Sequence, residues 1–166
     1  MAWLAGMRIT ATRLRDNAPF LVNYTSITSS TPTTTSTAPS AAITTPPITF
    51  RAGRAYRVAY RGGMSSSTVG QQGTMTITKG TAAGAAVMNS QRVPGPAGQA
   101  GTVGFYFENI VANNGADTTT ALVGTYAMTY QSGTGTIAVF GSAVTPAYLE
   151  VVDIGVATDY PSATSL

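Results

Sequence analysis

The chain has 166 residues with no His, no Cys, a single Lys, six carboxylates and a net charge of +3, which excludes a Ser-His-Asp triad, a His- or Cys-based metal site and a disulfide scaffold. About a quarter of the residues are Ser or Thr, and Thr suits the exposed faces of β-sheets. Charged residues make up 9%, against roughly 25% in an average soluble protein. We therefore expect a non-enzymatic protein whose surface is largely covered by neighbours or forms the surface of an extracellular particle.

Residues 1–22 are expected to form a docking arm with a short helix. Thr10 is a suitable N-cap for a helix over residues 11–16, which must end before Pro19. The apolar side chains are too few for a core, so the segment should pack on a partner or, alternatively, cap its own domain. The residues expected to touch the partner are Trp3, Leu4, Arg8, Ile9, Arg13, Leu14 and Arg15.

Residues 23–47 are rich in Thr and contain four prolines, which disfavours a helix. This segment is expected to be a flexible linker or one to two extended edge strands. The triplet Asn23-Tyr24-Thr25 matches a glycosylation sequon. Because residues 1–6 are too short and too weakly apolar for a signal peptide, we interpret the match as a coincidence and expect synthesis in the cytoplasm.

Residues 48–166 are expected to form one β-domain, because apolar and polar residues alternate with a period of two between Gly-rich turns. Gly62-Gly63 should end one strand, and residues 132–135 should form a hairpin loop. Gly95, Gly98, Gly101 and Gly104 have collagen spacing, but three triplets favour a loop over a trimeric contact. Strands are expected near residues 48–50, 56–61, 74–79, 103–107, 122–130, 136–140 and 147–154.

The fold class indicated by about eight such strands is all-β. An antiparallel β-sandwich with jelly-roll topology is the first choice, and an immunoglobulin-like sandwich is the second. No apolar run approaches the roughly 20 residues that cross a membrane, so we expect no membrane partner.

The densest charge feature is a group of arginines, and the predicted strand places two of them on one face. One interpretation is a basic interface strip that pairs with acidic residues of a partner or of a second copy. The alternative is a solvated outer face on which Arg discourages edge pairing. The basic residues are too scattered for nucleic-acid binding. The strip comprises Arg51, Arg54, Arg57 and Arg61.

Other chemistry is limited to a few candidates. Lys79 lacks the Ser-x-x-Lys motif of a Ser-Lys dyad. Glu108 and Glu150 are the candidate pair for a glycosidase, which needs two carboxylates flanking one bond. Glu150, Asp153 and Asp159 could hold Ca²⁺, although solvated or Arg-paired carboxylates are favoured. We expect no cofactor and no catalytic residue.

Three segments resemble small virion proteins of tailed phages that infect actinobacteria. Residues 5–14 are similar to an "AGxRITAxxLN" opening, residues 48–58 to a strand that follows a Thr-rich region, and residues 148–155 to an "LxVEDIGP" close. Arg15 and Val156 depart from that pattern. The resemblance implies a location in the virion, as a minor capsid, decoration or minor tail protein, and brings no catalytic residues.

The sequence therefore predicts a capsid decoration or head-fibre protein that docks by its arm on the major capsid protein and oligomerises, as a trimer. A minor tail or tail-fibre protein bound to a tail protein is the close alternative. A carbohydrate-binding module for a host surface glycan is the third, with Tyr24, Tyr106 and Tyr160 as its expected platform.

Overall fold

The computed structural model describes residues 18–95, 101–130 and 135–166. Apart from a 3-10 turn at Ala157–Asp159, its regular elements are all strands. Within these residues there is no helix of the length and apolarity that a bilayer crossing requires. The strands are β1 (Phe20–Ile27), β2 (Ser40–Thr44), β3 (Ile48–Phe50), β4 (Arg54–Ser66), β5 (Gln72–Lys79), β6 (Ala86–Pro94), β7 (Gly101–Asn113), β8 (Thr118–Thr120), β9 (Leu122–Tyr130), β10 (Ile137–Phe140), β11 (Ala147–Val156) and β12 (Thr164–Ser165).

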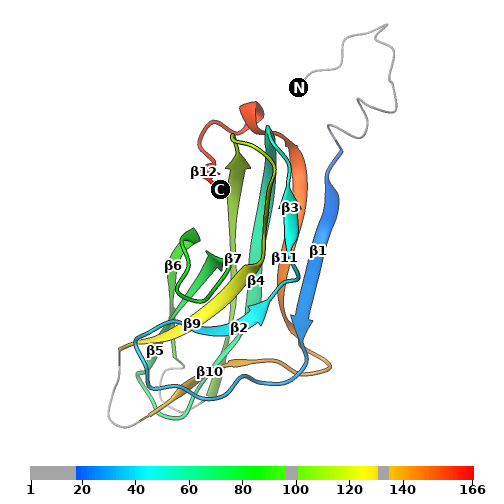
Figure 1. Ribbon diagram of the computed structural model, residues 1–166. Coiled ribbons are helices and arrows are strands. Elements are labelled where there is room, and N and C mark those ends of the chain that lie inside the picture. Colours follow the sequence, from blue (N-terminus) through cyan, green and yellow to red (C-terminus); the bar gives the residue numbers. More distant parts are fainter. Residues whose placement is uncertain (1–17, 96–100, 131–134) are drawn as a thin grey trace, which may run out of the picture.

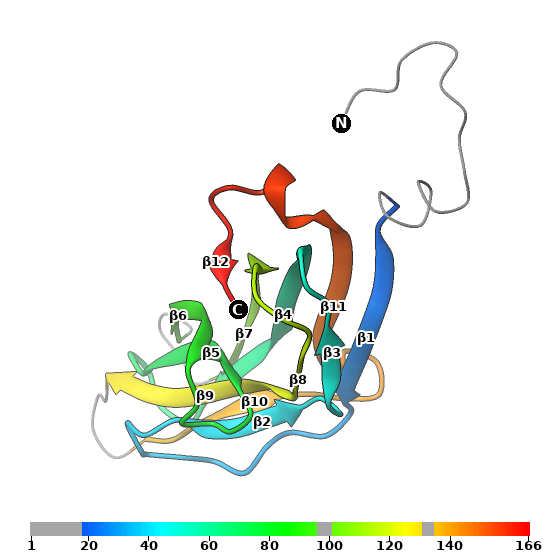
Figure 2. The ribbon, with the colours of Figure 1, turned by 45° about the horizontal axis from the view of Figure 1, so that its top comes forward.

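The strands form two main sheets that pack on each other (Figure 1). Sheet A has the order β1-β11-β4-β7, with β12 added beside β7 and β10 paired with β4. Sheet B has the order β2-β9-β5-β6, and β3 and β8 form a separate two-stranded ribbon. Figure 2 shows β2 and β9 running across the lower part of the view, in a direction different from that of the upright strands β11 and β1.

This strand order is that of a jelly roll. The chain folds like one long hairpin that is rolled up: β1 pairs with β11, β2 with β9, β4 with β7, and β5 with β6, all antiparallel. Successive pairs of the rolled hairpin alternate between the two sheets, which produces the two Greek keys of the fold. The predicted all-β sandwich and its jelly-roll topology are confirmed.

The core lies between the sheets because alternate residues of each strand point inward. On β4 the inward residues Tyr56, Val58, Tyr60 and Met64 are all at most 1% exposed. The ring of Tyr60 meets Phe105 edge to face, with 4.9 Å between ring centroids. Sheet B contributes a matching inner row of buried side chains, namely Met75, Ile77, Leu122, Tyr126 and Met128.

Glycines inside β4 correct one expectation from the sequence. Gly62-Gly63 does not end the strand, because β4 continues to Ser66 and keeps its register with β7 throughout. A Cβ atom at Gly62 would lie 2.9 Å from Cβ of Ala147, so the glycine is needed for close approach to β11. Strand β6 (Ala86–Pro94) was not expected, because most of its residues are exposed and show no regular alternation.

The strands of the structure do not follow the segment boundaries expected from the sequence. Strand β1 begins at Phe20 and runs across the boundary expected between residues 22 and 23, and β2 lies within residues 23–47. The expected helix over residues 11–16 and the seven docking residues of the arm lie outside the described residues. So do residues 132–134 of the expected hairpin loop, while Gly101 and Gly104 of the glycine repeat belong to β7.

Candidate functional site

The four arginines expected to form one strip lie in different surroundings. Arg54 is the first residue of β4, and its Nε and Nη2 donate to the two oxygens of Asp153 at 3.0 and 2.5 Å. The Asp153 side chain is 2% exposed and also accepts the backbone N–H of Gly155. Arg51 lies in the turn before β4. Only Arg57 and Arg61 share the outer face of sheet A.

Arg57 links two glutamates across the outer face of sheet A. Its Nη2 donates to Oε1 of Glu150 on β11 at 3.0 Å, and its Nη1 lies 4.0 Å from Oε2 of Glu108 on β7. Both glutamates lie opposite Ala59 of β4, one on each side. The hydroxyl of Tyr106 donates to Oε2 of Glu108 at 2.6 Å, and this hydrogen bond raises the pKa of Tyr106.

These contacts bear on the catalytic and metal candidates. Glu108 and Glu150 do come into one row, and Arg57 lies within ion-pair distance of both. Glu150 lies on the outer face, whereas Asp153 lies on the inner face with Arg54. No group of three metal-binding side chains occurs in the part of the chain that the structure describes.

Beside the Arg57 cluster, the outer face of sheet A contains a groove of about 760 Å³. Its row of side chains crosses three paired strands, because Tyr148 of β11, Arg61 of β4 and Tyr106 of β7 are register partners. The guanidinium carbon of Arg61 lies 5.9 Å from the centre of the Tyr148 ring, a cation–π arrangement. Tyr24 of β1 extends the row, with its ring centre 5.1 Å from that of Tyr148.

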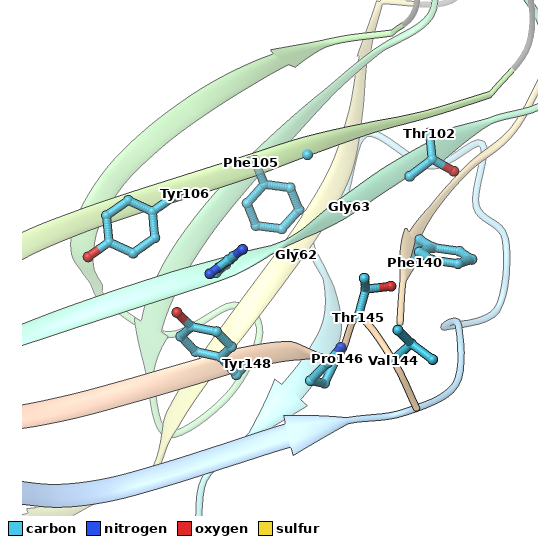
Figure 3. A pocket seen from close by; sticks show the side chains of 12 residues that line it. Gly62, Gly63, Thr102, Phe105, Tyr106, Phe140, Val144, Thr145, Pro146 and Tyr148 are labelled. Carbon is cyan, nitrogen blue, oxygen red and sulfur yellow. The ribbon is translucent and has the colours of Figure 1, made fainter. Parts of the chain in front are cut away.

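The floor of this groove is formed by glycines. Gly63 of β4 and Gly104 of β7 are register partners on the outer face. The side chain of Thr102 lies against Gly63, where a Cβ atom would be 2.7 Å from Thr102 Cγ2, whereas the space above Gly104 is open. Figure 3 shows Tyr106 and Tyr148 on the two sides of β4, with Phe140, Val144 and Pro146 around the far end. Among the residues that line the groove, Arg61 carries the one charge.

The exposed apolar residues gather at two places. Six large apolar side chains are exposed among the described residues, and two of them line the groove, whereas three lie on β1. The remaining one is in the turn between β4 and β5. The groove pair is Tyr106 and Val144, the β1 set is Phe20, Leu21 and Tyr24, and the turn residue is Val69.

Strand β1 is an edge strand without charge. It is bonded to β11 on one side and ends the strand order of sheet A on the other. Its sequence, FLVNYTSI, contains no Lys, Arg, Pro or acidic residue, the usual protection of an exposed edge. A second cavity, of about 540 Å³, opens where β1 begins and is lined by Phe20, Val22, Ile48 and other residues.

The outer face of sheet B is lined with hydroxyl groups. The hydroxyls of Thr74 and Thr129 are in contact, and those of Thr76 and Ser90 lie 3.0 Å apart. Arg92 lies opposite Thr74 at the margin of this face. Threonine side chains thus satisfy one another across the strands and leave a largely uncharged surface.

Of the three tyrosines expected to form a platform, Tyr24 and Tyr106 share the outer face of sheet A, but Tyr160 lies elsewhere and donates its hydroxyl to the carbonyl of Ile154. Tyr148 and Gly104 were not expected to be site residues. The sequence feature that could have pointed to the groove is the alternation that continues past Gly62-Gly63, because it places Gly63 on the same face as Arg61.

Comparisons with known proteins find only distant similarity. No protein-family model and no curated protein sequence matches the chain. Two similar solved structures are of infectious bursal disease virus. The Gt strain structure aligns at 14% identity over 90% of this chain with a TM-score of 0.43, and the Gx strain structure at 13% identity over 87% with a TM-score of 0.27. This chain spans 34% and 44% of those viral chains. The jelly-roll assignment therefore rests on the strand order of the chain itself.

Proposed function

We propose that this chain is a non-enzymatic structural protein of a phage virion, a capsid decoration or head-fibre protein that attaches to the major capsid protein through residues 1–22. The observation that carries the proposal is the free edge of β1, where three of the six exposed large apolar side chains lie on an uncharged edge strand. Such an edge invites pairing unless a partner covers it. The strand directly follows the segment in which the sequence predicts the docking residues.

Other features support this proposal. The resemblance of both ends of the chain to small virion proteins of actinobacterial phages implies a virion location. The charge content of 9% and the hydroxyl-lined outer face of sheet B favour contact with further copies, and we propose that the protein assembles as a trimer. The engagement of Glu108, Glu150 and Asp153 by arginines supports a structural rather than a catalytic role.

Attachment can be tested with particles that lack the protein. Purified full-length chain is added, the particles are sedimented, and the bound copies are measured. Leu21→Lys should reduce binding strongly, because it places a charge on the exposed edge, while Lys on an edge strand leaves the fold stable. Leu14→Asp should also reduce binding, through the predicted arm.

Val69→Lys is the matched control, because Val69 is 44% exposed and lies away from β1. It should bind like the unmodified chain. If Leu21→Lys attaches as well as the control, β1 is not part of the attachment surface and the proposal loses its main support.

Two alternatives remain distinct from this proposal. A minor tail or tail-fibre protein would use the same attachment surface at a lower copy number. A carbohydrate-binding adhesion module is favoured by one observation, the joining of Tyr24 and Tyr106 to Tyr148 and Arg61 on one exposed face.

A further inference from the structure

We propose that the groove on the outer face of sheet A binds a neutral glycan, with a sugar ring stacked on Tyr106 and its hydroxyls bonded to Arg61, which contacts the ring of Tyr148. The inference gives a site and a ligand class to the glycan-binding alternative. It does not depend on attachment to a capsid.

The shape of the groove suits a ring-shaped ligand. Its volume of about 760 Å³ lies within the range of ligand sites, roughly 300–1,000 Å³. The floor at Gly104 is open, because a Cβ atom there would have the Gly62 carbonyl oxygen, at 4.0 Å, as its nearest neighbour. A flat ring can therefore reach the backbone at Gly104, two residues along β7 from Tyr106.

The chemistry of the walls is amphipathic, as is a sugar. Tyr106, which is 50% exposed, offers an aromatic face to the C–H face of a sugar ring, and Tyr148 contacts Arg61 through a cation–π arrangement. Arg61 has no ion pair among the described residues, so its forked N–H donors are available to a pair of ring hydroxyls. Thr102 and Thr145 add hydroxyl groups that can both donate and accept.

Other classes of ligand fit less well. The groove lies on the face of sheet A, where β11 and β4 each have a paired strand on both sides, so a peptide cannot add between them as a strand. Among the described residues β7 has a paired strand on its far side only at Val111 and Ala112, so strand addition would take place beside the groove and not in it. A nucleic acid or other polyanion would meet Glu108 and Glu150 in the next row, where two glutamates balance Arg57 and Arg61. A neutral ligand avoids both obstacles.

The direct test is binding of the purified full-length chain to an array of neutral oligosaccharides built from glucose, galactose, mannose and arabinose, beside uronic-acid oligosaccharides. The chain should bind at least one neutral oligosaccharide, and the binding should persist at about 0.5 M NaCl, because no ion pair with the ligand is involved. Binding to no glycan, or only to acidic glycans in a salt-sensitive way, would overturn the inference.

Variants then locate the site by calorimetry with the best neutral oligosaccharide. Gly104→Val adds a side chain to the floor at a position where a Cβ atom meets nothing nearer than 4.0 Å, and it should abolish binding while thermal stability is kept. Tyr148→Ala and Arg61→Ala should each weaken binding about tenfold, as expected for loss of an aromatic contact or a charged hydrogen bond.

The matched controls lie outside the groove. Tyr160→Ala removes a tyrosine from another cavity, and Gly115→Val adds a side chain in a turn where its Cβ meets only Asn113 Oδ1, at 3.6 Å. Both should bind within about twofold of the unmodified chain, a change below 0.5 kcal/mol. A folded Gly104→Val variant that binds normally would refute the site. Leu21→Lys should retain glycan binding, so this test and the attachment test can fail separately.

Discussion

Replacing Tyr60 by Phe should stabilise the protein, and the gain should grow at alkaline pH. Tyr60 is fully buried on β4, and its hydroxyl has no hydrogen-bond partner among the described residues. A buried hydroxyl without a partner costs about 1–3 kcal/mol, and Phe fills the same space without it. We therefore expect the free energy of unfolding to rise by about 1 kcal/mol at pH 7.

The pH dependence follows from the same burial, which raises the pKa of Tyr60 above its ordinary value of 10.0. In the unfolded chain the phenol ionises near pH 10, whereas in the folded protein it stays protonated. Stability is thus fully present below pH 10 and is lost as the pH rises above it. Each such group changes the free energy of unfolding by about 1.4 kcal/mol per pH unit. The advantage of Tyr60→Phe should therefore reach about 2.4 kcal/mol at pH 11.

The assay is urea unfolding followed by circular dichroism at pH 7 and pH 11 for both proteins. Some alkaline loss should persist in the variant, because burial also raises the pKa of Tyr56 and the hydrogen bond to Glu108 raises that of Tyr106. Tyr24→Phe, on a half-exposed ring, is the control and should leave stability at pH 7 unchanged. A Tyr60→Phe variant that is less stable at pH 7 and has an unaltered alkaline slope would refute the reasoning.

Three further predictions concern packing and ion pairs, each measured by urea unfolding at pH 7. Gly124→Ala should lower the free energy of unfolding by about 1–3 kcal/mol, because its Cβ would lie 3.1 Å from both Leu149 Cδ1 and Tyr60 Cζ; an unchanged value would show that the core yields there. Arg54→Ala should cost about 3 kcal/mol, because it leaves Asp153 buried without its partner, and a loss below about 1 kcal/mol would contradict that view. Arg57→Ala should cost less than about 1 kcal/mol, because the Arg57 side chain is 40% exposed, and a larger loss would assign the outer-face cluster a structural role.

The alternation of apolar and polar residues predicted several of the strands, but it did not predict which strands pair. The alternation of Met75 and Ile77 with threonines identified β5, and the same signal identified β9 and β11. Strand β6 was not predicted, because its largely exposed residues show no regular alternation. The pairing of β1 with β11 joins segments at the two ends of the domain, and no local signal specifies such a contact.

In the candidate sites, too, the sequence predicted what lies within one strand but not the contacts between strands. The period of two placed Arg57 and Arg61 on one face, as the structure does. Arg54 could not be assigned to Asp153 from the sequence, because that contact depends on the neighbouring strand β11. The groove needs residues from β4, β7, β11 and the connection after β10, so its aromatic row became visible only with the register.

The central claim, a structural role in the virion, is tested most directly by quantitative mass spectrometry of purified phage particles. We expect the chain in every preparation at a fixed ratio to the major capsid protein, with a copy number of the same order as that of the capsid protein. A copy number that matches tail components would indicate that the protein belongs to the tail. Absence of the chain from purified particles would contradict a structural role in the virion.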